Sequence, residues 1–152
     1  MDVLRMLLAL VLMFCAIAVS LQFVLGPLYS GIGQAELAVW YYLDMLMAFS
    51  IVATLLVQLQ RKRAADRIRG DSLNRERLEA NVMFFLALLV ALWFFRNWFD
   101  FLSSNPIGDQ SVATIVIWYI LDPLLVILVG LTGIRLWHAS APTAAGSGGA
   151  RG

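Results

Sequence analysis

Four apolar runs, each about as long as a bilayer is thick, most limit the folds open to this chain. They cover residues 3–25, 37–59, 82–102 and 112–137. A hydrocarbon core about 30 Å thick is crossed by roughly 20 residues of helix, and a helix satisfies its own backbone hydrogen bonds in lipid. We therefore predict an all-α integral membrane protein with four transmembrane helices.

The composition agrees with lipid as the solvent. Of the 152 residues 61% are hydrophobic, against roughly 45–50% in soluble domains, and the mean hydropathy is +0.82. The first run continues well past Ala18, which is too long for the apolar part of a signal peptide, so we assign it as a span. We expect one transmembrane domain over residues 1–138 and a disordered tail of small residues over 139–152.

Basic residues in the connecting segments predict the orientation of the spans. The loop over residues 60–81 is rich in Arg and Lys, whereas the loops over 26–36 and 103–111 contain none. Arg5 precedes the first span and Arg135 closes the fourth. We therefore expect both termini and the central loop to be cytoplasmic, most simply in a bacterial inner membrane.

The second half of the chain resembles the first in sequence. Moving the chain by the 78 positions that separate residues 44 and 122 aligns spans one and two with spans three and four without gaps. The residues that coincide are Trp40, Tyr41, Leu43, Asp44 and Leu46 with Trp118, Tyr119, Leu121, Asp122 and Leu124. This pattern predicts two tandem helical hairpins. Because each hairpin enters and leaves on one side, they would be parallel repeats about an axis along the membrane normal.

Ionisable residues within the spans are functional-site candidates by default. The candidate polar cluster lies in the outer half of the bundle and consists of Asp44, Arg96, Asn97, Asp100 and Asp122. One cation and three carboxylates leave two negative charges uncompensated, which is costly in a low dielectric. At least one carboxylate must therefore be protonated, hydrated or paired outside the chain.

Three interpretations of this cluster remain open. In the first, Arg96 pairs with Asp44 or Asp122 across the bundle and the ion pair fixes helix register. In the second, Asp44 and Asp122 carry protons or ions. In the third, the two aspartates form an acid/base pair that shares one proton.

Proline and aromatic residues add further candidates. Pro123 follows Asp122 directly and leaves one backbone carbonyl unpaired, so it predicts a helix kink. Aromatic residues crowd the outer ends of the spans, more densely than an interfacial belt requires. We expect them to face lipid or a partner; the candidate surface consists of Trp40, Tyr41, Trp93, Trp98, Phe99, Trp118 and Tyr119.

The sequence lacks the motifs that are typical of several functional classes. There is no phosphate-binding glycine loop and no Cys/His cluster with metal-ligand spacing. His138, the one histidine, cannot supply paired haem ligands. We therefore predict no enzyme activity, no metal and no nucleic-acid partner; a bound lipid, quinone or pigment is compatible with the aromatic surface.

Two functional hypotheses follow. The first is a non-catalytic accessory subunit of a larger membrane protein complex, contributing helix packing and aromatic contacts. The alternative is a small ion- or proton-coupled transporter or channel, forming a homo-oligomer, that uses Asp44 and Asp122.

Overall fold

Every residue described by the computed structural model is helical. The description covers residues 2–29, 34–67, 75–103 and 112–140. The helices are α1 (Asp2–Tyr29), α2 (Gln34–Arg67), α3 (Arg75–Ser103) and α4 (Val112–Ser140). Each contains a stretch long and apolar enough to cross a membrane, which confirms the prediction of an all-helical chain with four such segments.

Two helices continue beyond the expected spans. α2 runs past residue 59 to Arg67, and α3 already begins at Arg75. Charged pairs support these extensions: Lys62 bonds Asp66 one turn away at 3.0 Å, as the spacing predicts, and Arg77 of α3 lies 3.4 Å from the same carboxylate.

The prediction of a disordered tail remains open. Its residues from 141 onward lie outside the described residues. α4 ends at Ser140, so its last turn enters the segment that was expected to be disordered.

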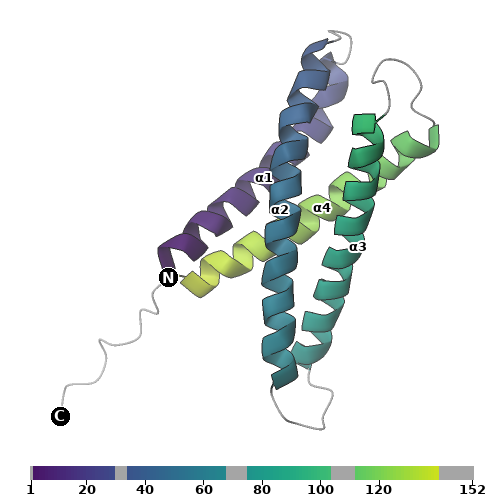
Figure 1. The fold of residues 1–152 in the computed structure, drawn as a ribbon. Helices are drawn as coiled ribbons and strands as arrows, with labels where there is room; N and C mark the ends of the chain where they lie inside the picture. Colours follow the sequence, from purple (N-terminus) through teal and green to yellow (C-terminus); the bar gives the residue numbers. More distant parts are fainter. Residues whose placement is uncertain (1, 30–33, 68–74, 104–111, 141–152) are drawn as a thin grey trace, which may run out of the picture.

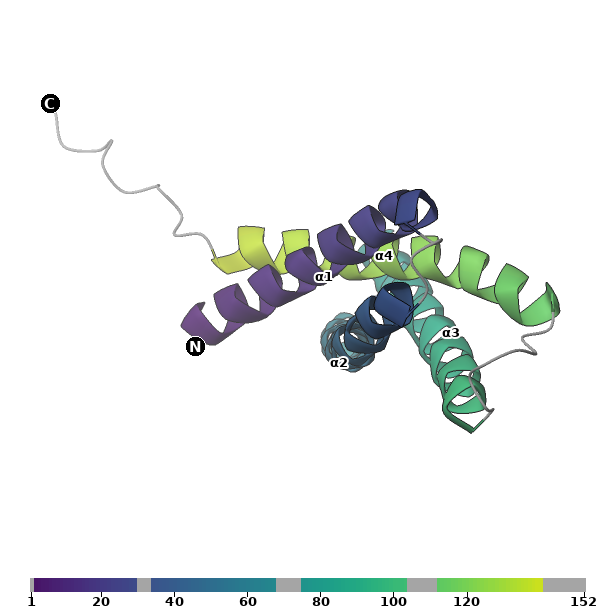
Figure 2. The same cartoon turned by 90° about the horizontal axis from the view of Figure 1, so that it is seen from above.

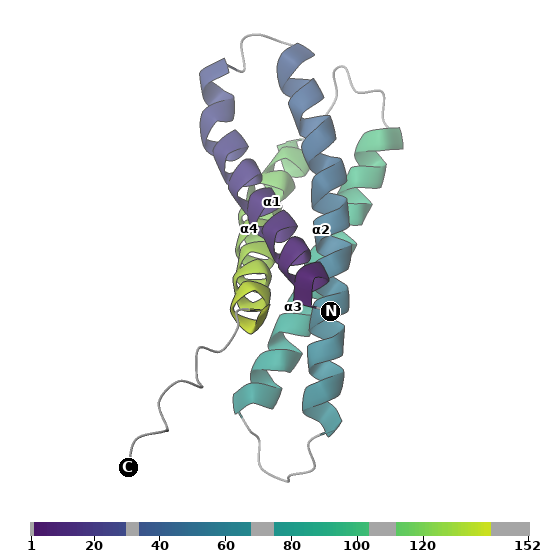
Figure 3. The ribbon, with the colours of Figure 1, turned by 90° about the vertical axis from the view of Figure 1, so that its left-hand side faces the viewer.

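The four helices form two antiparallel pairs. α1 packs most extensively against α4, and α2 against α3. In Figure 1 the α1–α4 pair lies obliquely across the more upright α2–α3 pair, and Figure 2 shows the two pairs as two layers. The start of α1 and the end of α4 point toward the same end of the molecule as the end of α2 and the start of α3 (Figure 3).

Small residues allow α1 and α4 to approach closely. A Cβ atom at Gly133 would lie 3.1 Å from the backbone oxygen of Ala9 and 3.2 Å from Cβ of Leu12. At Gly130 the nearest atom would be Cβ of Ala16, at an ordinary 3.5 Å. Since lipid supplies no hydrophobic drive between helices, close packing at such small residues is a main source of helix association in membranes.

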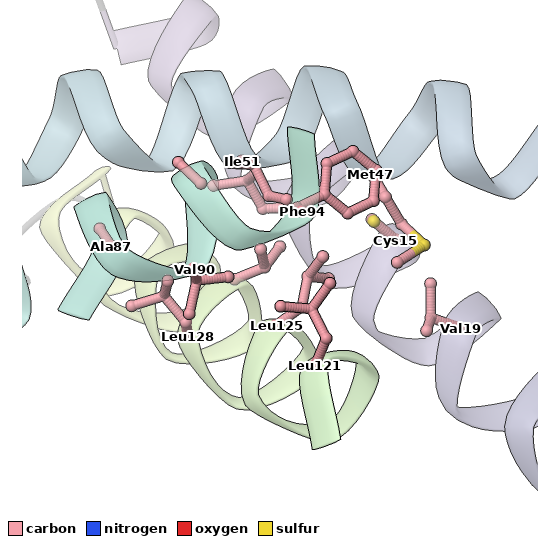
Figure 4. Close-up of a cluster of buried hydrophobic side chains, with 13 residues drawn as sticks. Cys15, Val19, Met47, Ile51, Ala87, Val90, Phe94, Leu121, Leu125 and Leu128 are labelled. Carbon is pink, nitrogen blue, oxygen red and sulfur yellow. The ribbon is translucent and has the colours of Figure 1, made fainter. Parts of the chain in front are cut away.

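The core lies where the two layers meet. Phe94 of α3 and Met47 of α2 are fully buried there, together with Leu121 and Leu125 of α4. Figure 4 shows these side chains converging from all four helices, with Cys15 of α1 among them. Cys15 is thus a small buried side chain in the core.

The outward faces of the helices are apolar. Large exposed side chains occur on every helix, among them Leu4, Phe49, Leu92 and Ile127. A water-soluble bundle would place polar residues at such positions. The surface therefore supports a membrane protein, in agreement with the helix lengths.

The two glycines of α4 provide a test of the close α1–α4 contact. Gly133→Ala should lower the free energy of unfolding in detergent by about 1–3 kcal/mol relative to Gly130→Ala, because only the first Cβ meets backbone that cannot move aside. Both substitutions gain the same helix propensity, so their difference reports packing alone. Equal stability of the two variants in an equilibrium unfolding titration would contradict the contact.

Candidate functional site

Asp44 and Asp122 occupy the interior faces of α2 and α4. Asp44 is 8% exposed and shares a helical face with buried Met47 and Ile51, whereas Asp122 is 6% exposed and shares one with Leu125 and Val129. The apolar periodicity of each helix thus turns its aspartate inward with the core.

The two carboxylates face the bundle interior from different helices. Within the described ranges no ion pair joins either of them to a cation. Atom Oδ1 of Asp122 is buried without a hydrogen-bond partner. A carboxylate pair without a cation is costly in its charged form, and it can be neutralised by binding a proton or another cation.

The other members of the candidate cluster do not join this pair. Arg96 and Asp100 are exposed on α3, and the expected ion pair between Arg96 and Asp44 or Asp122 is not found among the described residues. Asn97 is buried, but its side-chain amide donates to the backbone oxygen of Trp93 at 2.8 Å. Only Asn97 continues the buried stripe of α3, because Arg96 lies about 100° around the helix from it.

Sequence reasoning missed a set of buried polar side chains toward the other end of α2 and α4. Ser50, Thr54 and Gln58 are fully buried on α2, and Thr132 is buried on α4. The Gln58 amide donates to Oγ1 of Thr132 at 2.9 Å, and the Thr132 hydroxyl donates to the backbone oxygen of Leu128. Helical spacing from Asp44 through Thr54 to Gln58 was the available signal.

An ion cluster closes this end of the bundle. Glu79 of α3 pairs with Arg135 of α4 and lies 3.9 Å from Arg61 of α2. Arg61 also donates to the side-chain oxygen of Gln58 at 3.4 Å. The buried polar residues are therefore continuous with a charged group that is partly exposed.

The candidate aromatic residues divide into buried and exposed sets. Phe94 is in edge contact with Trp118 of α4, at 5.9 Å between ring centroids, and it stacks on Trp98 at 5.8 Å. Trp98 and Trp118 are half-buried against the core, as is Trp40. The exposed members of the set are Tyr41, Trp93, Phe99 and Tyr119.

Pro123 lies within α4, and its ring is exposed on the outer face. The helix continues through it from Val112 to Ser140. The kink therefore remains a prediction. Asp122 faces inward and the proline outward, and the proline leaves the backbone carbonyl of Tyr119, four residues earlier, without its usual hydrogen-bond donor.

The comparisons supply no relative. No protein-family model matches the chain, and no curated protein or solved structure matches it significantly. In the part of the chain that the structure describes, no group of three or more His, Cys, Asp and Glu residues could hold a metal ion.

Arg96 offers a test of how the aspartates are compensated. Arg96→Gln should change the free energy of unfolding by less than about 0.5 kcal/mol, as for an exposed residue without an ion pair. Removal of one partner of a buried ion pair would lower the free energy of unfolding by about 3–5 kcal/mol. As a matched control, Arg135→Gln should cost about 1 kcal/mol through loss of its ion pair. A loss for Arg96→Gln larger than that of the control would restore the ion-pair interpretation.

Proposed function

We propose that this chain is a small membrane-embedded ion carrier or channel in which Asp44 and Asp122 bind the ion that crosses. The observation that supports it is the pair of buried carboxylates on α2 and α4, neither of which is ion-paired with a cation among the described residues. Uncompensated carboxylates inside membrane helices are typical of ion and proton pathways. The ion binds and leaves unchanged, so the proposal assigns no enzymatic step.

We further propose that the two hairpins are parallel repeats. A two-fold axis along the bundle would exchange α1 with α3 and α2 with α4, so the α1–α4 pairing would be equivalent to the α3–α2 pairing. These are the two most extensive pairings in the bundle.

Burial follows the same offset and supports the repeat. On α2 and α4 the buried positions Asp44, Met47, Ser50, Ile51 and Thr54 correspond to buried Asp122, Leu125, Leu128, Val129 and Thr132. On α1 and α3 the buried positions Ala9, Leu12, Ala16 and Val19 correspond to buried Ala87, Val90, Phe94 and Asn97. Under this proposal the two aspartates are equivalent positions on either side of the axis.

The proposed orientation places the basic end of the bundle in the cytoplasm. That end carries the charged extensions of α2 and α3, and the start of α1 and the end of α4 point toward it. Positive residues are retained on the cytoplasmic side. A bacterial inner membrane is the location that we propose, with Asp44 and Asp122 nearer the outer face.

A second candidate, the accessory subunit of a larger membrane complex, is favoured by one observation. Arg96 is exposed between Trp93, which is 40% exposed, and Phe99, which is 58% exposed. It lies about 10 Å inside the end of α3 at Ser103. A guanidinium there is costly against lipid tails, and a partner subunit that offers an acceptor would cover it.

Substitution of the aspartates tests the carrier proposal. Asp44→Asn and Asp122→Asn should each lower ion flux into vesicles by about tenfold or more, equivalent to a barrier raised by about 1.4 kcal/mol. Flux is measured as charge movement across vesicles that contain the purified protein. Asp100→Asn is the matched control, because this exposed aspartate lies outside the pair. Flux that is undetectable in the unchanged chain, or equal in all three variants, would contradict the proposal.

Mass determination of the gently solubilised protein tests the subunit candidate. Native mass spectrometry should then find the chain bound to a larger membrane protein, and Arg96→Gln should release it, since the cation is the proposed contact. An active oligomer of this chain alone would exclude the accessory role.

A further inference from the structure

Buried polar side chains extend the aspartate pair into a column through the bundle. On α2 the column contains Asp44, Ser50, Thr54 and Gln58, all on one side of the helix. With a rise of 1.5 Å per residue, the column spans about 21 Å of a hydrocarbon core about 30 Å thick. The Gln58–Thr132 hydrogen bond joins α2 to α4, as polar side chains between membrane helices commonly do, but helix association of this kind does not account for Ser50 and Thr54.

The inner end of the column leads to a carboxylate. Gln58 is hydrogen-bonded to both Thr132 and Arg61, and Arg61 lies beside Glu79. The Glu79 side chain is 40% exposed. The column thus joins a buried pair of carboxylates to a carboxylate that reaches solvent.

Two hydroxyls in the column, those of Ser50 and Thr54, are buried without a hydrogen-bond partner, and the proposed repeat explains the second. Thr54 and Thr132 are equivalent positions, but Thr132 accepts a hydrogen bond from Gln58. The equivalent of Gln58 is Leu136, which has no donor. Oγ1 of Thr54 is therefore buried without a hydrogen-bond partner.

Three atoms of the column are buried without a hydrogen-bond partner: Oγ of Ser50, Oγ1 of Thr54 and Oδ1 of Asp122. Buried polar groups are nearly always hydrogen-bonded to protein or to ordered water. A bridging water makes two to four hydrogen bonds. Water held by these atoms would connect the aspartate pair to Gln58.

We infer that the ion is a proton, which moves between the Asp44–Asp122 pair and Glu79 along waters held by Thr54 and Gln58. This inference rests on the proposed function. Each transfer breaks one O–H bond and forms another: a carboxylic acid gives its proton to water, the carboxylate remains, and Glu79 receives a proton from the last water. No oxidant, reductant or further reactant is involved.

The spacing of the column favours a proton over a metal cation. Successive polar groups on α2 are four to six residues apart, or about 6–9 Å along the axis. Waters can bridge such intervals, whereas a metal cation needs several oxygen ligands around it at every position. Between Asp44 and Ser50 the fully buried side chain of α2 is Met47, whose apolar chain offers no oxygen ligand to a metal cation such as calcium or magnesium.

Thr54→Val separates a proton route from simple packing. Valine keeps the shape and removes the orphan hydroxyl, so the free energy of unfolding should be unchanged or higher. Proton flux should nevertheless fall by about tenfold, the effect of one lost hydrogen bond along the route. The measurement uses the full chain in vesicles of phosphatidylethanolamine and phosphatidylglycerol with a trapped pH dye, under a potassium diffusion potential.

Three further variants sharpen the experiment. Leu136→Gln should also reduce flux. A glutamine amide at this position would donate a hydrogen bond to Thr54, as Gln58 does to Thr132, and would take the place of the water. Glu79→Gln should reduce flux. Asp66→Asn should not, because Asp66 lies outside the column and is ion-paired with Lys62 and Arg77. Ser20→Ala removes a hydroxyl that bonds Ala16 on α1 and should leave flux unchanged.

The outcomes distinguish this inference from the proposed function. Proton flux that depends on Asp44 and Asp122 but is unchanged in Thr54→Val and Glu79→Gln overturns the route. Flux of sodium or potassium ions that depends on the aspartates, without proton flux, contradicts the inference that the ion is a proton. It agrees with the carrier proposal. Absence of any flux overturns both.

Discussion

The close approach of α1 and α4 sets the orientation of the bundle interior. A Cβ atom at Gly133 would press on the backbone of α1 at Ala9, so the absence of a side chain at this position permits the close approach of α4 to α1. With that face fixed against α1, Thr132 is directed toward α2 and Asp122 toward the interior. A contact made by a residue without a side chain thus determines which polar groups of α4 meet those of α2.

Differences between the two halves are as informative as their likeness. Ala16 and Phe94 correspond under the offset, yet one permits contact with Gly130 while the other fills the core and stacks on aromatic neighbours. The same comparison pairs Gln58 with Leu136, so one threonine is hydrogen-bonded and the other is not. A symmetric bundle would satisfy both hydroxyls or neither. The divergence therefore leaves the Thr54 hydroxyl on α2 without a partner, whereas its counterpart on α4 is hydrogen-bonded.

Sequence reasoning predicted the number of helices and their approximate bounds, because length and apolar composition are local properties. It did not separate Arg96 from Asn97, which are neighbours in the chain although only Asn97 lies on the buried stripe. The Gln58–Thr132 bond joins residues far apart in the sequence, so no local pattern indicates it. Which helices pair was also beyond prediction, since lipid-facing and core-facing apolar residues look alike in composition.

The pairing of the first helix with the last has a consequence for assembly during synthesis. α2 and α3 are neighbours in the chain and can associate as soon as the third helix enters the bilayer. α1 must wait in lipid until α4 is inserted, because its main partner is made later than α2 and α3. Membrane helices are stable individually before they associate, so this delay is tolerated, and contacts between distant segments form late. Asp44 therefore enters the membrane before its counterpart exists, and the interior is closed only when biosynthesis of the bundle is complete.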